Sequence, residues 1–138
     1  MGDLAKYAKD HGVKFFLFNF TDLFGVQRAK LVPAEAANRM QKAGAGFAGF
    51  ATWLDQTPAH PDILVMPAAD PIQLPWRPEV AWVAGEPWMN GEPLAQAPRV
   101  VLRKLTEKYA KNNMKLMAGV EPEFHLINAD GSGVSDHR

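Results

Sequence analysis

The sequence contains no cysteine among its 138 residues. This absence excludes disulfide bonds, zinc sites built on thiolates and cysteine nucleophiles. An excess of one charge is also lacking, because 15 Lys and Arg residues balance 15 Asp and Glu residues. The electrostatic footprint of a nucleic-acid-binding protein is therefore missing, and we expect no nucleic-acid partner.

Long hydrophobic runs and targeting segments are lacking as well. Residues 1–6 read Met-Gly-Asp-Leu-Ala-Lys and carry no apolar signal segment. No apolar run approaches the roughly 20 residues that a membrane-spanning helix needs. We therefore expect a cytoplasmic protein with no membrane partner.

The hydrophobic residues, 47% of the chain, follow helix and strand periods, unlike the composition of a disordered protein. They predict a mixed sheet over residues 13 to 95 with a helix packed on it. Helices are expected at residues 3–11, at 34–43 and from 98 onward. Strands are expected at 13–21, 26–32, 63–66, 80–85 and 114–127. Hairpin turns are expected at 22–25, 90–91 and 130–133.

The predicted strand at residues 13–21 is rich in phenylalanine. Phe16, Phe18 and Phe20 share one face, and the opposite face is also apolar. Both faces should then be buried, which indicates a central strand. The predicted helix from residue 98 has an apolar stripe, and its charged residues are expected to form a solvated face. That stripe is Val101, Leu102, Leu105 and Tyr109, and the charged residues include Arg99 and Arg103.

Proline and tryptophan concentrate in the middle of the chain. Nine of the eleven prolines fall within residues 57–98, next to many branched apolar residues. This composition indicates short strands between fixed turns. The sequence leaves open whether the four tryptophans pack inside this region or form a subunit contact. They are Trp53, Trp76, Trp82 and Trp88.

The segment from Gly119 to Ile127 carries the strongest chemical signal. Side chains alternate across a strand, so Glu121, Glu123 and His125 should share one face. Clustered carboxylates suit hard divalent cations such as Mg²⁺ or Mn²⁺. The competing interpretation is a Glu-x-Glu pair on the solvated face of an edge strand. The flanking Gly119 and the intervening Pro122 favour the metal site.

The predicted helix and strand at residues 98–127 have no following strand or helix in the sequence. A single strand cannot close a core. We therefore expect a complete domain at residues 1–97 and the truncated start of a second domain at residues 98–138.

Three motifs, in this order, resemble the N-terminal part of the glutamine synthetase family. Residues 13–34 resemble the first hairpin of that family's N-terminal β-grasp domain, with Phe20-Thr21-Asp22 and Gly25 at its turn. Residues 62–67 resemble its Asp-x-x-x-x-Pro strand. Residues 119–124 resemble the Gly-x-Glu-x-Glu-Phe strand that opens the catalytic domain. The segment 44–51 is most similar to the type III enzymes and their γ-glutamylamide ligase relatives.

The resemblance implies an α+β fold, with a β-grasp domain at residues 1–97 and the first helix and strand of a catalytic domain at residues 98–138. It implies an ATP-dependent glutamate–ammonia ligase that acts through γ-glutamyl phosphate, with Mg²⁺ or Mn²⁺ neutralising the phosphoryl charge. It also implies a homo-oligomer, a dodecamer of two hexameric rings. The family's remaining acids, metal-binding histidine and phosphate-binding arginines have no counterpart in this sequence. We therefore expect this chain alone to be inactive.

The resemblance also assigns roles to the acidic segment. Glu123 matches the family's ligand for the metal ion near glutamate. Glu121 matches a ligand for the metal ion between the ATP phosphates. His125 stands where many members have phenylalanine. A third ligand is one interpretation, and we favour a neighbour that forms a hydrogen bond at the edge of the site.

The sequence departs from the family in one loop. Well-known bacterial members carry Phe-Asp-Gly-Ser-Ser there, and the aspartate helps to bind and deprotonate ammonium in the neighbouring subunit. Here Ala48 and Ala51 replace the polar residues, and neither can accept a hydrogen bond from ammonium. Either another acid such as Asp55 or Asp62 acts instead, or the acceptor is a less polar amine such as methylamine, which makes a γ-glutamylmethylamide synthetase the alternative function.

A function of another class stays open. A non-catalytic β-grasp module could pair with full-length subunits through its tryptophan-rich surface. The two hypotheses differ in one observation, the reading frame beyond Arg138. Further catalytic-domain motifs there would favour the ligase, and a natural stop would favour the interaction module.

Overall fold

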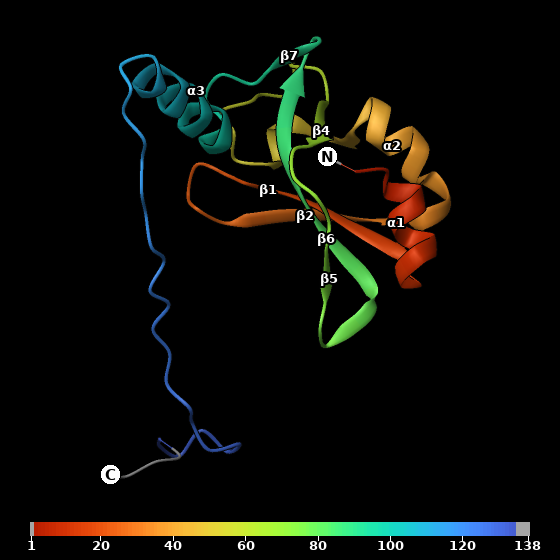
Figure 1. The fold of residues 1–138 in the computed structure, drawn as a ribbon, viewed down its shortest axis with the longest axis vertical. Helices are drawn as coiled ribbons and strands as arrows, with labels where there is room; N and C mark the ends of the chain where they lie inside the picture. Colours follow the sequence, from red (N-terminus) through yellow and green to blue (C-terminus); the bar gives the residue numbers. More distant parts are fainter. Residues whose placement is uncertain (1, 135–138) are drawn as a thin grey trace.

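The computed structural model describes residues 2–134, which form a mixed sheet with helices at both ends and an extended C-terminal segment (Figure 1). The strands are β1 (Phe15–Thr21), β2 (Gln27–Pro33), β3 (Ala45–Phe47), β4 (Ile63–Pro67), β5 (Ile72–Leu74), β6 (Arg77–Met89) and β7 (Glu92–Pro93). The helices are α1 (Leu4–His11), α2 (Ala37–Ala43) and α3 (Pro98–Ala110), with 3₁₀ turns η1 (Ala34–Ala36) and η2 (Gly49–Ala51).

The sheet has the order β2-β1-β6-β4-β3, with β5 and β7 also paired to β6. Strands β1 and β6 are parallel, and every other pair is antiparallel. Strand β6 therefore joins all parts of the sheet, which explains why residues 80–87 are almost entirely buried. The predicted mixed sheet over residues 13–95 and the central place of β1 are confirmed.

Two predicted hairpin turns are confirmed by their backbone conformation. Asp22 and Val26 close the β1–β2 turn through a backbone hydrogen bond of 2.9 Å, and Gly25 takes a φ of 80°. Asn90 and Gly91 have φ values of 54° and 82° between β6 and β7. Positive φ at both central residues is what a two-residue hairpin loop requires, and Asn-Gly adopts it most readily.

The core lies on one face of the sheet. Phe16 and Phe18 are fully buried, and Phe20 is 2% exposed. Full burial of each such ring stabilises the fold by roughly 1.5–3 kcal/mol. The expectation that both faces of this strand are buried is wrong, because Phe15 is 36% exposed and Leu17 is half-buried. The helices cover one face of β1 and leave the other partly open.

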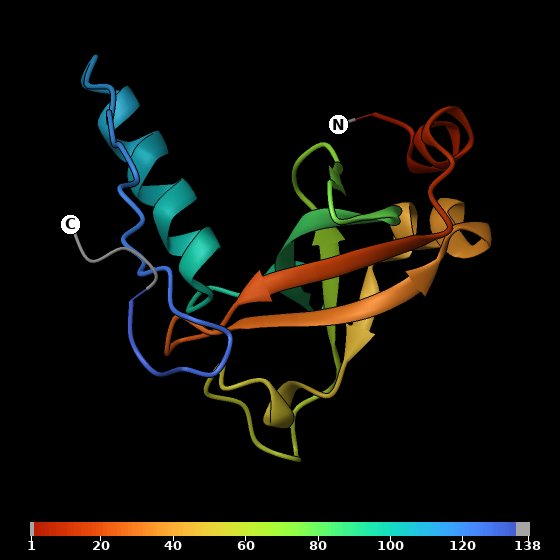
Figure 2. The same cartoon turned by 90° about the horizontal axis from the view of Figure 1, so that it is seen from below.

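The helices lie at opposite ends of the sheet (Figure 2). Helix α1 begins after Asp3, whose side chain accepts a hydrogen bond from the backbone N–H of Lys6, and it ends at Gly12 with a φ of 68°. The predicted helix at 34–43 begins as the 3₁₀ turn η1 and continues as α2. Helix α3 begins at Pro98, and Val100 is its buried residue.

The apolar stripe of α3 is uncovered. Its residues are between 45% and 54% exposed, namely Val101, Leu102, Leu105 and Tyr109. The prediction that the charges of this helix form only a solvated face is wrong for Arg103, which forms an ion pair with Glu86 of β6.

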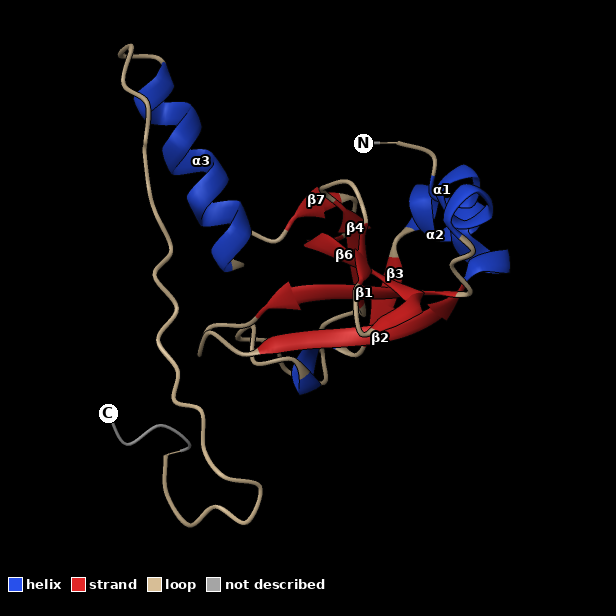
Figure 3. Cartoon of the chain, turned by 60° about the horizontal axis from the view of Figure 1, so that its bottom comes forward, coloured by secondary structure: helices blue, strands red, loops and turns tan. Residues whose placement is uncertain are grey.

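The predicted strand at residues 114–127 is wrong. These residues form no named strand (Figure 3). Residues 104–132 are all exposed. A strand needs a partner for its backbone N–H and C=O groups, and the described part of the chain offers none to this segment. Only Ile127 and Val134 form an isolated bridge, around the turn that was predicted at 130–133.

The four tryptophans differ in their exposure, and a subunit contact through them stays a prediction. Trp53 and Trp76 are 60% and 80% exposed, while Trp82 and Trp88 are half-buried. Across residues 2–134, no helix has both the length and the apolarity that a membrane span requires.

Candidate active-site segments

The acidic segment, which contains Glu121 and Glu123, lies beyond the end of α3 and is exposed to solvent. Glu121, Glu123 and His125 are exposed, as are the apolar neighbours Val120 and Phe124 at 90% and 77%. A shallow hollow of about 550 Å³ is lined by residues 122–125. The two acids lie outside the sheet, as expected, but on an unpaired extended segment and not on a strand.

The donor set for a metal ion is incomplete in the described residues. Nowhere in residues 2–134 do three His, Asp or Glu side chains gather so that they could hold a metal ion. The oxygen chemistry of Glu121 and Glu123 suits Mg²⁺ or Mn²⁺. Such an ion takes about six ligands, so two carboxylates supply only part of a site.

The loop that departs from the family is well fixed. Ala48 and Ala51 are exposed at the two ends of η2, while Thr52 is buried and its Oγ1 donates to the carbonyl of Gly49 at 2.6 Å. Leu54 is fully buried, and the Gln96 side chain donates to its carbonyl at 2.9 Å. The loop is thus held in place through Thr52 and Leu54, while its two alanines are exposed to solvent.

The two residues on either side of Leu54 are not glycines, yet both have a left-handed backbone conformation. Trp53 and Asp55 have φ values of 52° and 55°. This conformation costs roughly 1–2 kcal/mol for an ordinary residue, so tertiary contacts must hold it. The Trp53 carbonyl accepts from the N–H of Leu23 at 3.2 Å, and its ring lies edge-on to Phe24 at 5.4 Å. Both aromatic rings are largely exposed.

The two acids proposed for the amine site are both on the surface. Asp55 lies in this loop, and Asp62 directly precedes β4. Neither side chain makes a hydrogen bond or ion pair with another described residue. The structure does not gather either of them with Glu121 and Glu123 into one metal-binding group within residues 2–134.

Sequence reasoning missed two buried carboxylates. Asp22 is fully buried, and its oxygens accept from the N–H groups of Phe24 and Val26 and from Arg28. Glu86 is 8% exposed and pairs with Arg103. For Glu86 the available signal was an acid within an apolar strand, since an acid at such a position is rarely buried without a partner.

Electrostatics at Asp22 follow from these contacts. Burial by itself would raise the pKa of the Asp22 carboxyl. The hydrogen bonds from Val26, Arg28 and Phe24 together outweigh burial, so its pKa lies below the ordinary value. Asp22 therefore organises the β1–β2 turn as a carboxylate.

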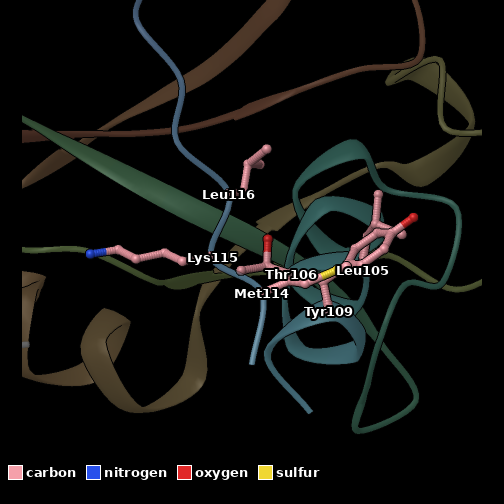
Figure 4. Close-up of a pocket in the computed structure, with 6 residues that line it drawn as sticks. All are labelled: Leu105, Thr106, Tyr109, Met114, Lys115 and Leu116. Atoms are coloured by element: carbon pink, nitrogen blue, oxygen red, sulfur yellow. The ribbon is translucent and has the colours of Figure 1, made fainter. Parts of the chain in front are cut away.

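An apolar hollow lies between α3 and the segment that follows it (Figure 4). It encloses about 370 Å³ and is lined by residues of α3 and of the next segment, namely Leu105, Thr106, Tyr109, Met114, Lys115 and Leu116. The Lys115 side chain points away from the helix (Figure 4). The hollow carries no carboxylate and lacks the chemistry of a metal site.

The fold matches known protein structures over nearly the whole chain. No family model matches the sequence. A solved structure of GmaS in complex with ADP superposes with a TM-score of 0.84 at 46% identity, covering 99% of this chain and 32% of GmaS. The architecture is thus the α+β fold of glutamine-synthetase-like proteins, which confirms the predicted fold class.

Curated relatives define the family. The glutamine synthetase of Rhizobium leguminosarum bv. phaseoli is 60% identical over 135 residues, which are 97% of this chain and 31% of that protein. The glutamate–methylamine ligase of Methyloversatilis universalis is 36% identical over 128 residues, 91% of this chain and 29% of that protein. The chain belongs to the glutamine synthetase family, and it spans about a third of the length of these relatives.

Proposed function

We propose that this sequence is part of an ATP-dependent glutamate–ammonia ligase that acts through γ-glutamyl phosphate. The observation that carries the proposal is the 60% identity to a glutamine synthetase over 97% of the chain. Because the chain spans 31% of that relative, the activity is proposed for the complete protein. The 138 residues alone are proposed to be inactive.

Glu121 and Glu123 are proposed as metal ligands. Their carboxylates have the hard oxygen donors that Mg²⁺ and Mn²⁺ prefer, and both are exposed and form no ion pair with another residue of the described range 2–134. When bound, such an ion would neutralise the charge of the transferring phosphoryl group. The ligase reaction needs ATP and glutamate as substrates. We place the boundary between a β-grasp domain and a catalytic domain at residues 97/98, and we propose a cytoplasmic homo-oligomer.

A second candidate is a ligase that uses methylamine as the acceptor. It is supported by the exposed alanines Ala48 and Ala51 at the ends of η2, which offer no hydrogen-bond acceptor side chain to ammonium. It is also supported by the 36% identity to a glutamate–methylamine ligase. Ammonia stays the first candidate, because identity to the glutamine synthetase is much higher.

The test is made on the complete reading frame that encodes this sequence. Initial rates with ATP, glutamate, Mg²⁺ and either ammonia or methylamine give two values of kcat/KM. A preference for ammonia of about a hundredfold, equivalent to about 2.7 kcal/mol, would discard the methylamine reaction. Absence of both activities, or a stop codon after Arg138, would support the non-catalytic interaction module instead.

Variants of the same protein test the metal ligands. We expect Glu123→Ala to lower kcat by orders of magnitude while the β-grasp domain stays folded, and Glu121→Ala to impair mainly the ATP-dependent step. The matched control is Glu35→Ala, an exposed acid of η1 with no assigned role, which should leave the rates unchanged. Rates within a few-fold of wild type for both variants would show that the assignment is wrong.

A further inference from the structure

Glu86 is a buried acid next to α3 whose carboxylate accepts three hydrogen bonds. It lies in β6, and its side chain is 10% exposed. Its two oxygens accept hydrogen bonds from Nε of Arg103 at 2.8 Å and from a second guanidinium nitrogen at 3.3 Å. The indole N–H of Trp88 donates to the same carboxylate at 3.2 Å. Two parallel N–H donors from one guanidinium fix direction as well as distance, which a lysine cannot do.

Arg103 is in turn held on its own helix. It donates to Glu107, one turn further along α3, at 3.1 Å. The hydrogen bonds to Glu86 first, and then to Glu107, raise the pKa of Arg103, so the guanidinium stays charged. The pair thus links a fixed position in β6 to the second turn of α3.

Little else holds the outer part of α3. Val100 packs in a core cluster with Leu94 and Ala97, so the first turn of the helix is anchored by apolar contacts. Within residues 2–134, the bonds from Arg103 to Glu86 are the only side-chain hydrogen bonds between α3 and the sheet. A groove of about 490 Å³ lies beside the pair, between β4, β6 and α3. The residues of the apolar stripe of the helix are between 45% and 54% exposed, so they are only partly covered.

We propose that Glu86 and Arg103 form a latch that sets the direction in which α3 leaves the sheet, with the turn at Val100 as the pivot. The Glu86 side chain is 10% exposed and the Arg103 side chain 41%, so the pair adds little net stability, while its two-pronged guanidinium contact fixes a direction. The segment that carries Glu121 and Glu123 follows α3, so the latch also determines the position from which this segment leaves the helix. This last consequence rests on the proposed function; the latch itself does not.

The absence of cysteine makes the test direct. Spin labels on Ala29→Cys in β2 and Lys108→Cys in α3, both exposed positions, report the distance between sheet and helix by double electron–electron resonance. We expect a narrow distance distribution in the labelled chain. Arg103→Met should broaden it about twofold, as expected when one of two anchors is lost, and Glu86→Gln should broaden it less. Arg103→Lys should lie between wild type and Arg103→Met.

Matched controls separate direction from stability. Arg99→Met removes an exposed arginine of the same helix, and Glu107→Gln breaks only the pair within α3, so both should keep the narrow distribution. A pair that merely stabilises the fold would lower Tm without changing the distances. Unchanged distributions in folded Glu86→Gln and Arg103→Met would overturn the latch. If Arg103→Met fails to fold, Glu86→Gln, which keeps an acceptor for Trp88, decides the question alone.

Discussion

At the scale of single residues, Gly85 explains how β6 contacts two neighbours at once. A Cβ atom at this position would lie 2.2 Å from Cγ1 of Val65 and 3.0 Å from the carbonyl oxygen of Asn19. The glycine therefore allows β4 and β1 to approach β6 from both sides. Its role is close backbone approach, because its φ lies outside the left-handed region.

Replacing Gly85 should destabilise the protein. Gly85→Ala forces a methyl group against the backbone of β1, and we expect a loss of about 1–3 kcal/mol in the free energy of unfolding. The matched control is Gly46→Ala in β3, where a Cβ meets nothing within 4 Å, and we expect a change below about 0.5 kcal/mol. Urea unfolding measures both. Equal effects at the two positions would contradict the packing argument.

Two histidines require opposite tautomers. Nδ1 of His60 accepts from the backbone N–H of Thr57 at 3.0 Å, so this nitrogen carries no proton. Nδ1 of His11 faces the carbonyl of Tyr7 at 3.0 Å, an acceptor only, so this nitrogen carries the proton.

Long-range ¹⁵N–¹H NMR should therefore show the Nε2–H form for His60 and the Nδ1–H form for His11. His60→Asn, whose amide oxygen can replace Nδ1 as acceptor, should keep the Thr57 amide hydrogen-bonded. The same tautomer on both rings would refute this prediction.

At the scale of secondary-structure elements, the β1–β2 hairpin depends on a charge. The buried Asp22 carboxylate accepts from two backbone N–H groups of its own turn and from Arg28, which is 34% exposed. The turn presents Leu23, Phe24 and Val26 to solvent as a result. A neutral side chain of the same size cannot satisfy these three donors equally well.

The stability of this hairpin should depend on pH in a defined direction. The pKa of Asp22 is lower in the folded than in the unfolded state, so its contribution is present above the unfolded pKa and is lost as pH falls through the folded pKa. We expect Asp22→Asn to lower Tm at neutral pH, and the difference from wild type to shrink below about pH 4. The exposed control Asp62→Asn should leave Tm unchanged at neutral pH. If the Tm of Asp22→Asn stays below that of wild type by the same amount at every pH, the shape of the side chain and not its charge stabilises the turn.

At the scale of the whole molecule, the chain divides into a packed sheet and an unpaired acidic segment. The sheet carries two buried apolar clusters, one that includes residues of α1 and α2 and one that includes Leu54, Leu94 and Val100. The segment from 114 to 126 has no backbone pairing beyond the N–H of Met114, which donates to Tyr109. Local stability should therefore differ sharply between the two parts.

Hydrogen exchange on the 138-residue chain tests this division. We expect amides of β1 and β6 to exchange only when the whole chain unfolds, so that their protection equals the free energy of unfolding. Amides of residues 115–126 should exchange without protection. In the complete protein, protection of residues 115–126 would mean that a partner strand pairs with them there. Strong protection in the chain alone would mean that this segment finds a partner within the 138 residues.

The local parts of this fold could be read from the sequence. The Asp3 cap, the Asp22–Gly25 turn, the Asn90-Gly91 hairpin and the alternation of Phe16, Phe18 and Phe20 each depend on a few neighbouring residues. The family could be recognised for the same reason, since its motifs are short and contiguous. The predicted strand at residues 80–85 is too short, because β6 runs from Arg77 to Met89 and Gly85 allows its neighbours to approach closely within it.

What the tertiary structure alone decided depends on residues far apart in the sequence. The ion pair between Glu86 and Arg103 joins positions 17 residues apart, and no local pattern distinguishes it from two solvated charges. The predicted strand at 114–127 has the right alternation, but a strand exists only where another strand accepts its hydrogen bonds. The sequence by itself determined local conformation and the chemical character of Glu121 and Glu123. Pairing and burial were decided by the fold, because both require a partner that local sequence does not specify.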